Sequence, residues 1–224
     1  MNRLKIPAAG LAGVLMLTLL LSLPGCGNRG TTALKESPTS GKARIAADES
    51  FQPIIDAEVD TFTALYNYAE ITPVYMPENE LVAFFLNDSV KVIASSWTPS
   101  DEQRQVLLDL QTVVRTTAVA YDAIALVMHR TNPDSLLTYQ NVKDIFTGAV
   151  TDWKQIDPDS KLSQINIVFD NVRSGNIRYF RELFELPEQL APNFFAVKTN
   201  PEVIEYVSQS PGALGIVSVN WISD

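Results

Sequence analysis

Short apolar segments alternate with segments of helical spacing along most of this 224-residue chain, and this alternation constrains its fold most strongly. Seven strands are predicted, at Arg44–Ala47, Ile71–Met76, Val90–Ala94, within Val119–His129, and at Ile165–Phe169, Phe194–Val197 and Ala213–Val219. Helices are predicted between them, over Gln52–Tyr68, Glu80–Leu86, Ser100–Leu110, Thr138–Gly148, Ser174–Leu186 and from Asn200 to Ser208. Ser100 is predicted to open a capping box, Thr138 to cap its helix, and Asn200 to be the N-cap of the last helix. This alternation predicts an α/β fold with mainly parallel sheets. Ligands of such folds bind at the carboxyl ends of strands, beside helix N-termini.

Cys26 is the only cysteine of the chain, and it follows a leader-like segment. Arg3 and Lys5 precede an apolar stretch over residues 6–23, and Pro-Gly stands directly before Cys26. This order is typical of a secretory signal peptide over residues 1–25. The pattern resembles the lipobox of bacterial lipoproteins, which implies cleavage before Cys26 and lipidation of that residue. An uncleaved transmembrane anchor is the alternative.

Residues 26–42 are rich in Gly, Ser, Thr and Pro and are predicted to form a flexible tether. The chain carries 17 Lys and Arg against 26 Asp and Glu, and loss of the leader leaves 15 against 26, a net charge of −11. This charge disfavours nucleic acids and anionic membrane surfaces as partners, but it is compatible with a small anion held by local donors. Because no cysteine follows Cys26 and His129 is the only histidine, we expect no disulfide, no metal site and no cofactor.

Two loops that follow predicted strands carry hydroxyl groups close to a helix start. The first loop is Asp48-Glu49-Ser50-Phe51, where Ser50 is expected near free backbone N–H groups. The second is Ser95-Ser96-Trp97-Thr98, whose two hydroxyls beside an aromatic ring suit a polar ligand. An ordinary N-cap and an ordinary turn explain the same residues, and this alternative stays open.

A third loop, from Phe169 to Arg178, gives the strongest indication of an anion site. Ser174, Gly175 and Asn176 place a hydroxyl, an unobstructed backbone N–H and a side-chain amide at a helix start. Such converging donors at the positive end of a helix dipole favour anions. Arg173 and Arg178 are within reach of this turn, although an N-cap beside two solvated arginines is the alternative.

Several motifs in the second half of the chain resemble phosphate-type ABC-transporter substrate-binding proteins. They are Asp-Ala-Ile-Ala-Leu-Val-Met-His at 122–129, Asn-Pro at 132–133, Leu-Thr at 137–138, Val-Lys-Asp-Ile-Phe-Thr-Gly at 142–148, Thr-Asp-Trp at 151–153 and Pro-Gly-Ala-Leu-Gly-Ile-Val at 211–217. The resemblance runs from about Ala43 to the end of the chain. Within that family, the whole chain most resembles a branch of lipoproteins.

The resemblance implies a type II periplasmic-binding-protein fold, in which two α/β lobes close on an oxyanion in the cleft between them. The first lobe is expected over residues 43–117, the second over 118–217, and the start of a return crossing over 218–224. Hinge segments are expected near 115–121 and 217–221. With the arginines of the third loop, the expected ligand-binding residues are Glu49, Ser50, Phe51, Ser95, Ser96, Arg173, Ser174, Gly175, Asn176 and Arg178.

The chain departs from the family pattern at several positions. Asp170-Asn171 stands where the family has an arginine, and Asn176 replaces a threonine. The acidic sequence Pro77-Glu78-Asn79-Glu80 replaces a helix start rich in Gly and Ser. Family members also continue beyond the hinge with helices that complete the first lobe, so we expect a C-terminally truncated chain with an incomplete first lobe.

The resemblance implies a lipid-anchored monomer outside the cytoplasm, in the periplasm. It would capture phosphate or a similar oxyanion and pass it to a membrane ABC permease. A carboxylate in the site would accept a hydrogen bond from protonated phosphate and repel sulfate, with Glu49 as the first candidate and Asp48 as the second. A non-transport lipoprotein that senses or binds an anion is the alternative. Catalysis is not expected, because the chain has no Gly-x-Ser-x-Gly motif and His129 lies in an apolar strand pattern.

Overall fold

A computed structural model describes residues 36–133 and 136–223 of the chain. The predicted signal peptide, Cys26 and the tether up to residue 35 lie outside the described residues.

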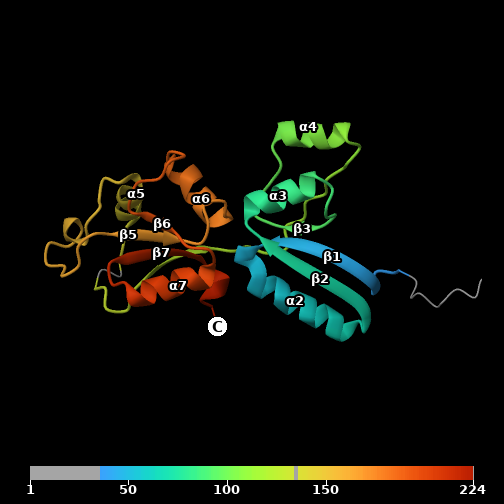
Figure 1. Cartoon of the computed structure of the whole chain (residues 1–224), viewed down its shortest axis with the longest axis horizontal. Coiled ribbons are helices and arrows are strands. Elements are labelled where there is room, and N and C mark those ends of the chain that lie inside the picture. Colours follow the sequence, from blue (N-terminus) through green and yellow to red (C-terminus); the bar gives the residue numbers. More distant parts are fainter. Residues whose placement is uncertain (1–35, 134–135, 224) are drawn as a thin grey trace, which may run out of the picture. The chain divides into compact units, whose positions relative to one another are not determined.

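The first sheet contains three parallel strands in the order β2-β1-β3 (Figure 1). Strands β1 (Ser40–Asp48) and β2 (Tyr68–Met76) pair along their whole length, and β3 (Ile93–Ala94) pairs with the last part of β1. The carboxyl ends of all three strands therefore meet at one edge. This edge carries the loops that begin with Glu49, Pro77 and Ser95.

Three helices accompany the first sheet: α2 (Gln52–Leu65), α3 (Glu78–Leu86) and α4 (Asp101–Asp109). In Figure 1, α2 and α3 flank opposite sides of this sheet. Its buried core is small and consists of Ala46, Leu81 and Val90. No residue of α2 is fully buried.

The second sheet has the order β4-β7-β5-β6. Strand β7 (Ala213–Ser218) pairs antiparallel with β4 (Ile124–Met128) and parallel with β5 (Asn166–Phe169), which pairs parallel with β6 (Phe194–Ala196). The remaining elements are helices α5 (Tyr139–Thr147), α6 (Gly175–Phe184) and α7 (Asn200–Gln209) and the short 3-10 helices η1 (Glu49–Phe51), η2 (Trp153–Gln155) and η3 (Val219–Trp221).

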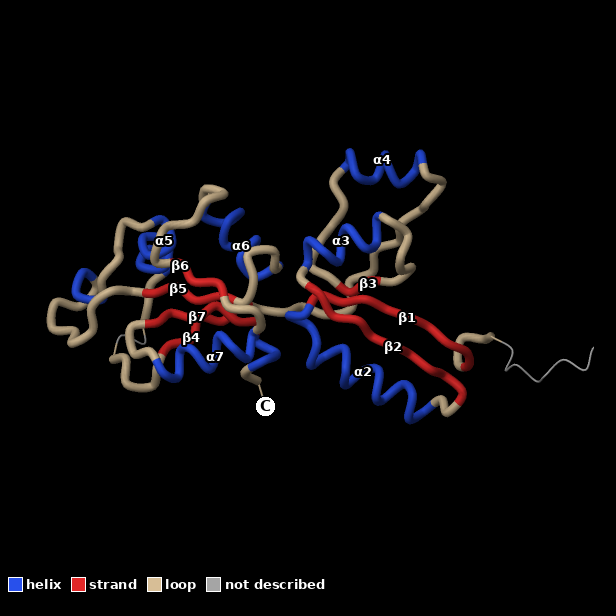
Figure 2. The backbone as a smooth tube through the Cα atoms, in the orientation of Figure 1, coloured by secondary structure: helices blue, strands red, loops and turns tan. Residues whose placement is uncertain are grey.

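Alternating residues of the second sheet pack on its two faces, as the period of a strand requires. One face carries Ile167, Phe169, Leu214 and Ile216 and packs against α5 and α6. The opposite face carries Val168, Ala213 and Val217 and packs against Val203 and Val207 of α7. Figure 2 shows these helices on the two sides of the sheet. The result is a substantial core that holds the start of α6 firmly beside the end of β5.

The predicted α/β class, with mainly parallel sheets, is confirmed, and the differences lie at element ends. Strand β1 starts at Ser40, inside the predicted tether, because its polar first residues pair with β2. The predicted helix to Tyr68 ends at Leu65, since Tyr68 already belongs to β2. Only Ile124–Met128 of the apolar run 119–129 forms a strand.

Local capping signals were more reliable than apolar runs, with one exception. Ser100 forms the predicted capping box, Thr138 caps α5 as predicted and also forms a capping box, and Gly148 ends α5 in the left-handed conformation at φ 81°. The prediction that Asn200 caps α7 is wrong, because Thr199 accepts the capping bond from the Glu202 amide. Asn200 is wholly buried, and its side chain bonds elsewhere.

Candidate functional site

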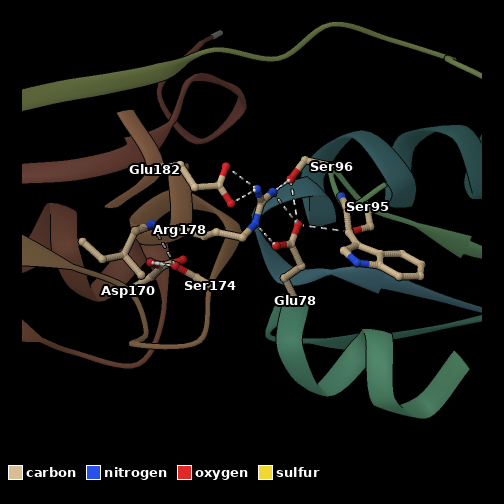
Figure 3. Close-up of polar contacts among 9 residues, drawn as sticks. Glu78, Ser95, Ser96, Asp170, Ser174, Arg178 and Glu182 are labelled. Atoms are coloured by element: carbon tan, nitrogen blue, oxygen red, sulfur yellow. Dashed lines mark hydrogen bonds and ion pairs between the residues drawn. The ribbon is translucent and has the colours of Figure 1, made fainter. Parts of the chain in front are cut away.

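The candidate site lies where the first sheet's strand-end loops contact the start of α6. The end of β1, the start of α3 and the loop after β3 supply Asp48, Glu78 and Ser96, while α6 supplies Gly175 and Arg178. Figure 3 shows the polar contacts of this region. Residues from both sheets therefore build it together.

An ion pair between the buried Glu78 and the partly exposed Arg178 forms the centre of the site (Figure 3). Glu78 opens α3, and only 1% of its surface is exposed. Arg178 donates from Nε to Glu78 Oε1 and from Nη2 to Glu78 Oε2, the latter at 3.2 Å. Its Nη1 donates to both carboxylate oxygens of Glu182, at 3.0 and 3.1 Å. Hydrogen bonding to Glu78, above all, raises the pKa of Arg178.

Two serines of the loop after β3 complete the surroundings of the Glu78 carboxylate. The hydroxyl of Ser96 donates to Glu78 Oε2 at 2.7 Å, and that of Ser95 donates to the same oxygen at 3.2 Å. Arg178 Nη2 also donates to Ser96 Oγ, at 3.0 Å. The carboxylate thus collects four donated hydrogen bonds from Arg178 and the two serines.

Gly175 permits the close approach between α6 and the first-sheet loops. A Cβ atom at this position would lie 3.0 Å from Asp48 Oδ2 and 3.2 Å from both Glu78 Oε2 and Ser96 Oγ. Such contacts are too tight for a side chain, so only glycine fits without movement. The first N–H groups of a helix have no partner within that helix, and Gly175 is the first residue of α6.

Asp170, at the end of β5, organises the residues around the start of α6. Ser174 donates to Asp170 Oδ1 at 2.6 Å and caps α6 by accepting from the Ile177 amide at 3.4 Å. Asn176 Nδ2 and Asn200 Nδ2 both donate to Asp170 Oδ2, at 3.2 and 3.4 Å. Burial raises the pKa of Asp170 despite these bonds. The side chains of Ser174 and Asn176 therefore belong to an internal network.

The end of β1 and the following η1 add the carboxyl groups of Asp48 and Glu49 and the hydroxyl of Ser50. Asp48 Oδ1 accepts from the Ser50 amide at 2.9 Å, and burial, with a contribution from the Glu78 charge, raises the pKa of Asp48 to about 6. Burial and then the Asp170 charge raise the pKa of Glu49 to about 7. Glu49 Oε1 and Ser50 Oγ are buried without a hydrogen-bond partner among the described residues.

These raised pKa values predict that stability falls as the pH rises. The pKa of Asp48 rises from 3.8 to about 6 and that of Glu49 from 4.5 to about 7, so the folded protein holds more protons than the unfolded chain within that range. The free energy of unfolding should therefore fall by about 1–3 kcal/mol between pH 5 and pH 8, with Glu49 discounted for its partial exposure. Urea unfolding at a series of pH values measures this.

The matched variant for this pH dependence is Asp48→Asn, which cannot titrate at that position. Its free energy of unfolding should fall less steeply between pH 5 and pH 8 than that of the wild type. A wild-type stability that increases over this interval would contradict the assignment of raised pKa values.

The residues predicted to bind a ligand fall into three groups in the structure. Ser95, Ser96, Gly175 and Arg178 surround the Glu78 carboxylate. Glu49, Ser50 and the half-buried Phe51 form η1, while Ser174 caps α6 and Asn176 is the second residue of that helix. Arg173 lies apart from the donors around Glu78: it is exposed and pairs with Glu80 at 2.8 Å.

Sequence reasoning missed the central place of Glu78. Its loop follows a predicted strand and opens a helix, which is the same signal that marked the other three loops. Because this loop is acidic, the sequence predicted only that it would disfavour a bound anion. The roles of Asp170 and Asn200 as organisers were also missed, because they depend on contacts between segments far apart in the chain.

Two kinds of site find no support in the described part of the chain. Among residues 36–133 and 136–223, no three His, Cys, Asp or Glu side chains lie where they could share a metal ion. Over the same ranges, no helix has both the length and the apolar character needed to cross a membrane.

Comparison with protein families identifies the fold. Residues 32–224 match the family described as the PBP superfamily domain. This chain belongs to the PBP superfamily. Its two sheets with their helices are the two α/β lobes of the type II fold of that superfamily. The expected fold class is therefore confirmed.

Similar proteins include several that are named for phosphate. The phosphate-binding protein PstS of Borreliella burgdorferi is 23% identical over 182 residues, which cover 79% of this PBP-superfamily chain and 63% of that relative. The chain thus spans less than two thirds of the length of this curated relative.

Solved structures show the same fold at low identity. One of them is a Clostridium perfringens protein described as a phosphate ABC-transporter substrate-binding protein and solved with bound phosphate. Its TM-score is 0.70 and its identity 23%, and the match covers 80% of this chain and 70% of that one. An ABC-type phosphate transport receptor from Vibrio cholerae has a TM-score of 0.61 and 19% identity, with coverage of 82% and 73%.

Proposed function

We propose that this PBP-superfamily protein captures an oxyanion, specifically phosphate, between its two lobes and delivers it to an ABC permease. The observation that carries this proposal is the convergence of Arg178, Ser95, Ser96 and the N-terminus of α6 around one carboxylate. Arginine, hydroxyl groups and a helix N-terminus are the donors that proteins use for phosphate. The names of the similar proteins support the same ligand.

The carboxyl group of Glu49 is proposed to select phosphate over sulfate. Its Oε1 is buried without a hydrogen-bond partner among the described residues, and burial raises the pKa of Glu49 to about 7, so part of the molecules carry the ionised group at neutral pH. The ionised form of this group can accept a hydrogen bond from a phosphate hydroxyl, whereas fully ionised sulfate has no proton to donate. Asp48, with its raised pKa, is the second candidate for this role.

The proposed location is outside the cytoplasm, most simply the periplasm, with lipid on Cys26 as the anchor. The order of basic, apolar and small residues before Cys26 supports this, and residues 26–39 would then link the anchor to β1. The protein is proposed to act as a monomer, with hinges near residues 115–121 and 217–221. The similar proteins bear the names of binding proteins and transport receptors, which supports a binding role without catalysis.

Thermal unfolding of the protein from Gly27 onward, with phosphate, with sulfate and with neither, tests the proposed ligand. A ligand at 100 times its dissociation constant stabilises the native state by about 2.7 kcal/mol. We expect phosphate to raise the unfolding temperature and sulfate to leave it unchanged. A cooperative transition that neither anion shifts would contradict phosphate binding.

A non-transport sensor of an anion is the second candidate function. The occupation of the site's donors by Glu78 favours it, because a resident carboxylate would lower the affinity for a free anion. Genes for a permease and an ATPase beside this gene would favour transport, and their absence would favour sensing.

A further inference from the structure

The Glu78 carboxylate occupies the donors that the proposed function assigns to phosphate. It accepts from Arg178 Nε and Nη2, from Ser96 Oγ at 2.7 Å and from Ser95 Oγ at 3.2 Å (Figure 3). A carboxylate and a phosphate each present two oxygens to the guanidinium of arginine. Arginine can therefore bind either of them through two parallel hydrogen bonds. The same donors therefore suit an internal and an external oxyanion.

The surroundings of Glu78 leave little room for a second anion beside it. Glu78 Oε2 and Asp48 Oδ2 lie within 3.2 Å and 3.0 Å of the place where a Gly175 Cβ would stand, which is the side of α6 that faces the first-lobe loops. A phosphate at the same donors would face the Glu78 carboxylate at contact distance. Like charges that close repel strongly in a partly buried site.

The pair also connects residues from the two lobes. Glu78 opens α3 of the first lobe and Arg178 belongs to α6 of the second lobe, 100 residues later in the chain. The Asn79 amide donates to the Arg173 carbonyl at 3.2 Å in the same region. The internal carboxylate therefore makes the interlobe contacts that a captured anion makes in the proposed function.

From these contacts we infer that Glu78 is an internal competitor for the anion: its carboxylate occupies Arg178, Ser95 and Ser96 until phosphate displaces it. This inference rests on the proposed function. It makes Glu78 a residue that sets affinity, since every binding event must first separate Glu78 from Arg178. A direct acceptor role for Glu78, toward a phosphate hydroxyl, makes the opposite prediction, because loss of the acceptor would then weaken binding.

Calorimetric titration of phosphate into three proteins tests the inference: the wild type, Glu78→Gln and Glu80→Gln. Glutamine keeps the size of Glu78 but removes its charge, so E78Q should bind phosphate at least ten times more tightly than the wild type, a difference of about 1.4 kcal/mol. Glu80 lies on the same helix and also pairs with an arginine of the other lobe, Arg173, but this pair is exposed. E80Q should therefore bind phosphate within about twofold of the wild type.

Each outcome of the titration decides the inference. Tighter binding by E78Q alone, or binding by E78Q where the wild type shows none, supports it. Equal or weaker binding by E78Q beside a wild type that binds would overturn the inference and leave the proposed function standing. Absence of phosphate binding in all three proteins would contradict both the inference and the proposed function.

A second variant covers the case in which E78Q does not unfold cooperatively. Glu78→Asp retains the charge but shortens the side chain by one methylene, which withdraws the carboxylate from Arg178. Its affinity for phosphate should rise several-fold, and an affinity equal to that of the wild type would overturn the inference.

Discussion

Replacing Arg178 by methionine is expected to abolish phosphate binding and to lower the free energy of unfolding by about 2–4 kcal/mol. This loss is smaller than that for a fully buried ion-pair partner, because Arg178 is partly exposed. Methionine keeps the apolar stem of the side chain but leaves Glu78, with 1% of its surface exposed, without a cation. The uncompensated carboxylate in a buried position supplies the loss of stability. Urea unfolding and phosphate titration of the same preparation measure the two effects.

Arg173→Met is the matched control, since Arg173 also pairs across the lobes, with Glu80 at 2.8 Å. About half of each side chain in that pair is exposed, and such pairs contribute about 0–1 kcal/mol. R173M should therefore unfold at nearly the wild-type urea concentration. Equal losses in the two variants would show that the burial of the Glu78–Arg178 pair has no energetic consequence.

Replacing Trp153 by alanine is expected to cost about 3–5 kcal/mol of stability, the usual range for removal of a buried aromatic side chain. Trp153 is wholly buried within the core beneath α5 and α6, and its indole Nε1 donates to the Gly212 carbonyl at 3.0 Å. The substitution removes both the packing and this bond. Since the free energy of unfolding of a typical protein is about 5–15 kcal/mol, the urea concentration at the unfolding midpoint should fall sharply.

Trp153→Phe separates the two contributions of Trp153. Phenylalanine fills much of the volume but cannot donate to Gly212, so its loss should be smaller, about 1–3 kcal/mol. Circular dichroism during urea unfolding compares the three proteins. A loss below about 1 kcal/mol for W153A would mean that the second-lobe core is not the main source of stability, contrary to its extent in the structure.

Local signals in the sequence were sufficient for much of the fold. The periods of strands and helices predicted all the named strands and α-helices, and the capping box at Ser100 and the cap at Thr138 formed as predicted. These signals depend on residues at most four positions apart, which a sequence displays directly. The start of β1 at Ser40 was missed because its polar residues become a strand only through pairing with β2.

The candidate site was only partly predictable, for a related reason. The turn Ser174-Gly175-Asn176 was recognisable, because a helix start depends on local chemistry. The partner of Arg178 was not, since Glu78 lies 100 residues earlier and an acidic residue in a helix's first turn is common for reasons of the helix dipole. Asn200 was predicted to be an N-cap because it precedes a proline at a helix start. Its position depends instead on tertiary contacts with Asp170 and the Ser218 amide.

A crystal structure of the protein from Gly27 onward, obtained with phosphate, tests the central claim most directly. It should contain a phosphate at the start of α6, within hydrogen-bond distance of Gly175, Ser96 and Arg178, with the Glu78 carboxylate turned away from Arg178. A structure that retains the Glu78–Arg178 pair and has no phosphate at these donors, at a concentration that saturates any binding seen in solution, would contradict phosphate capture at this site.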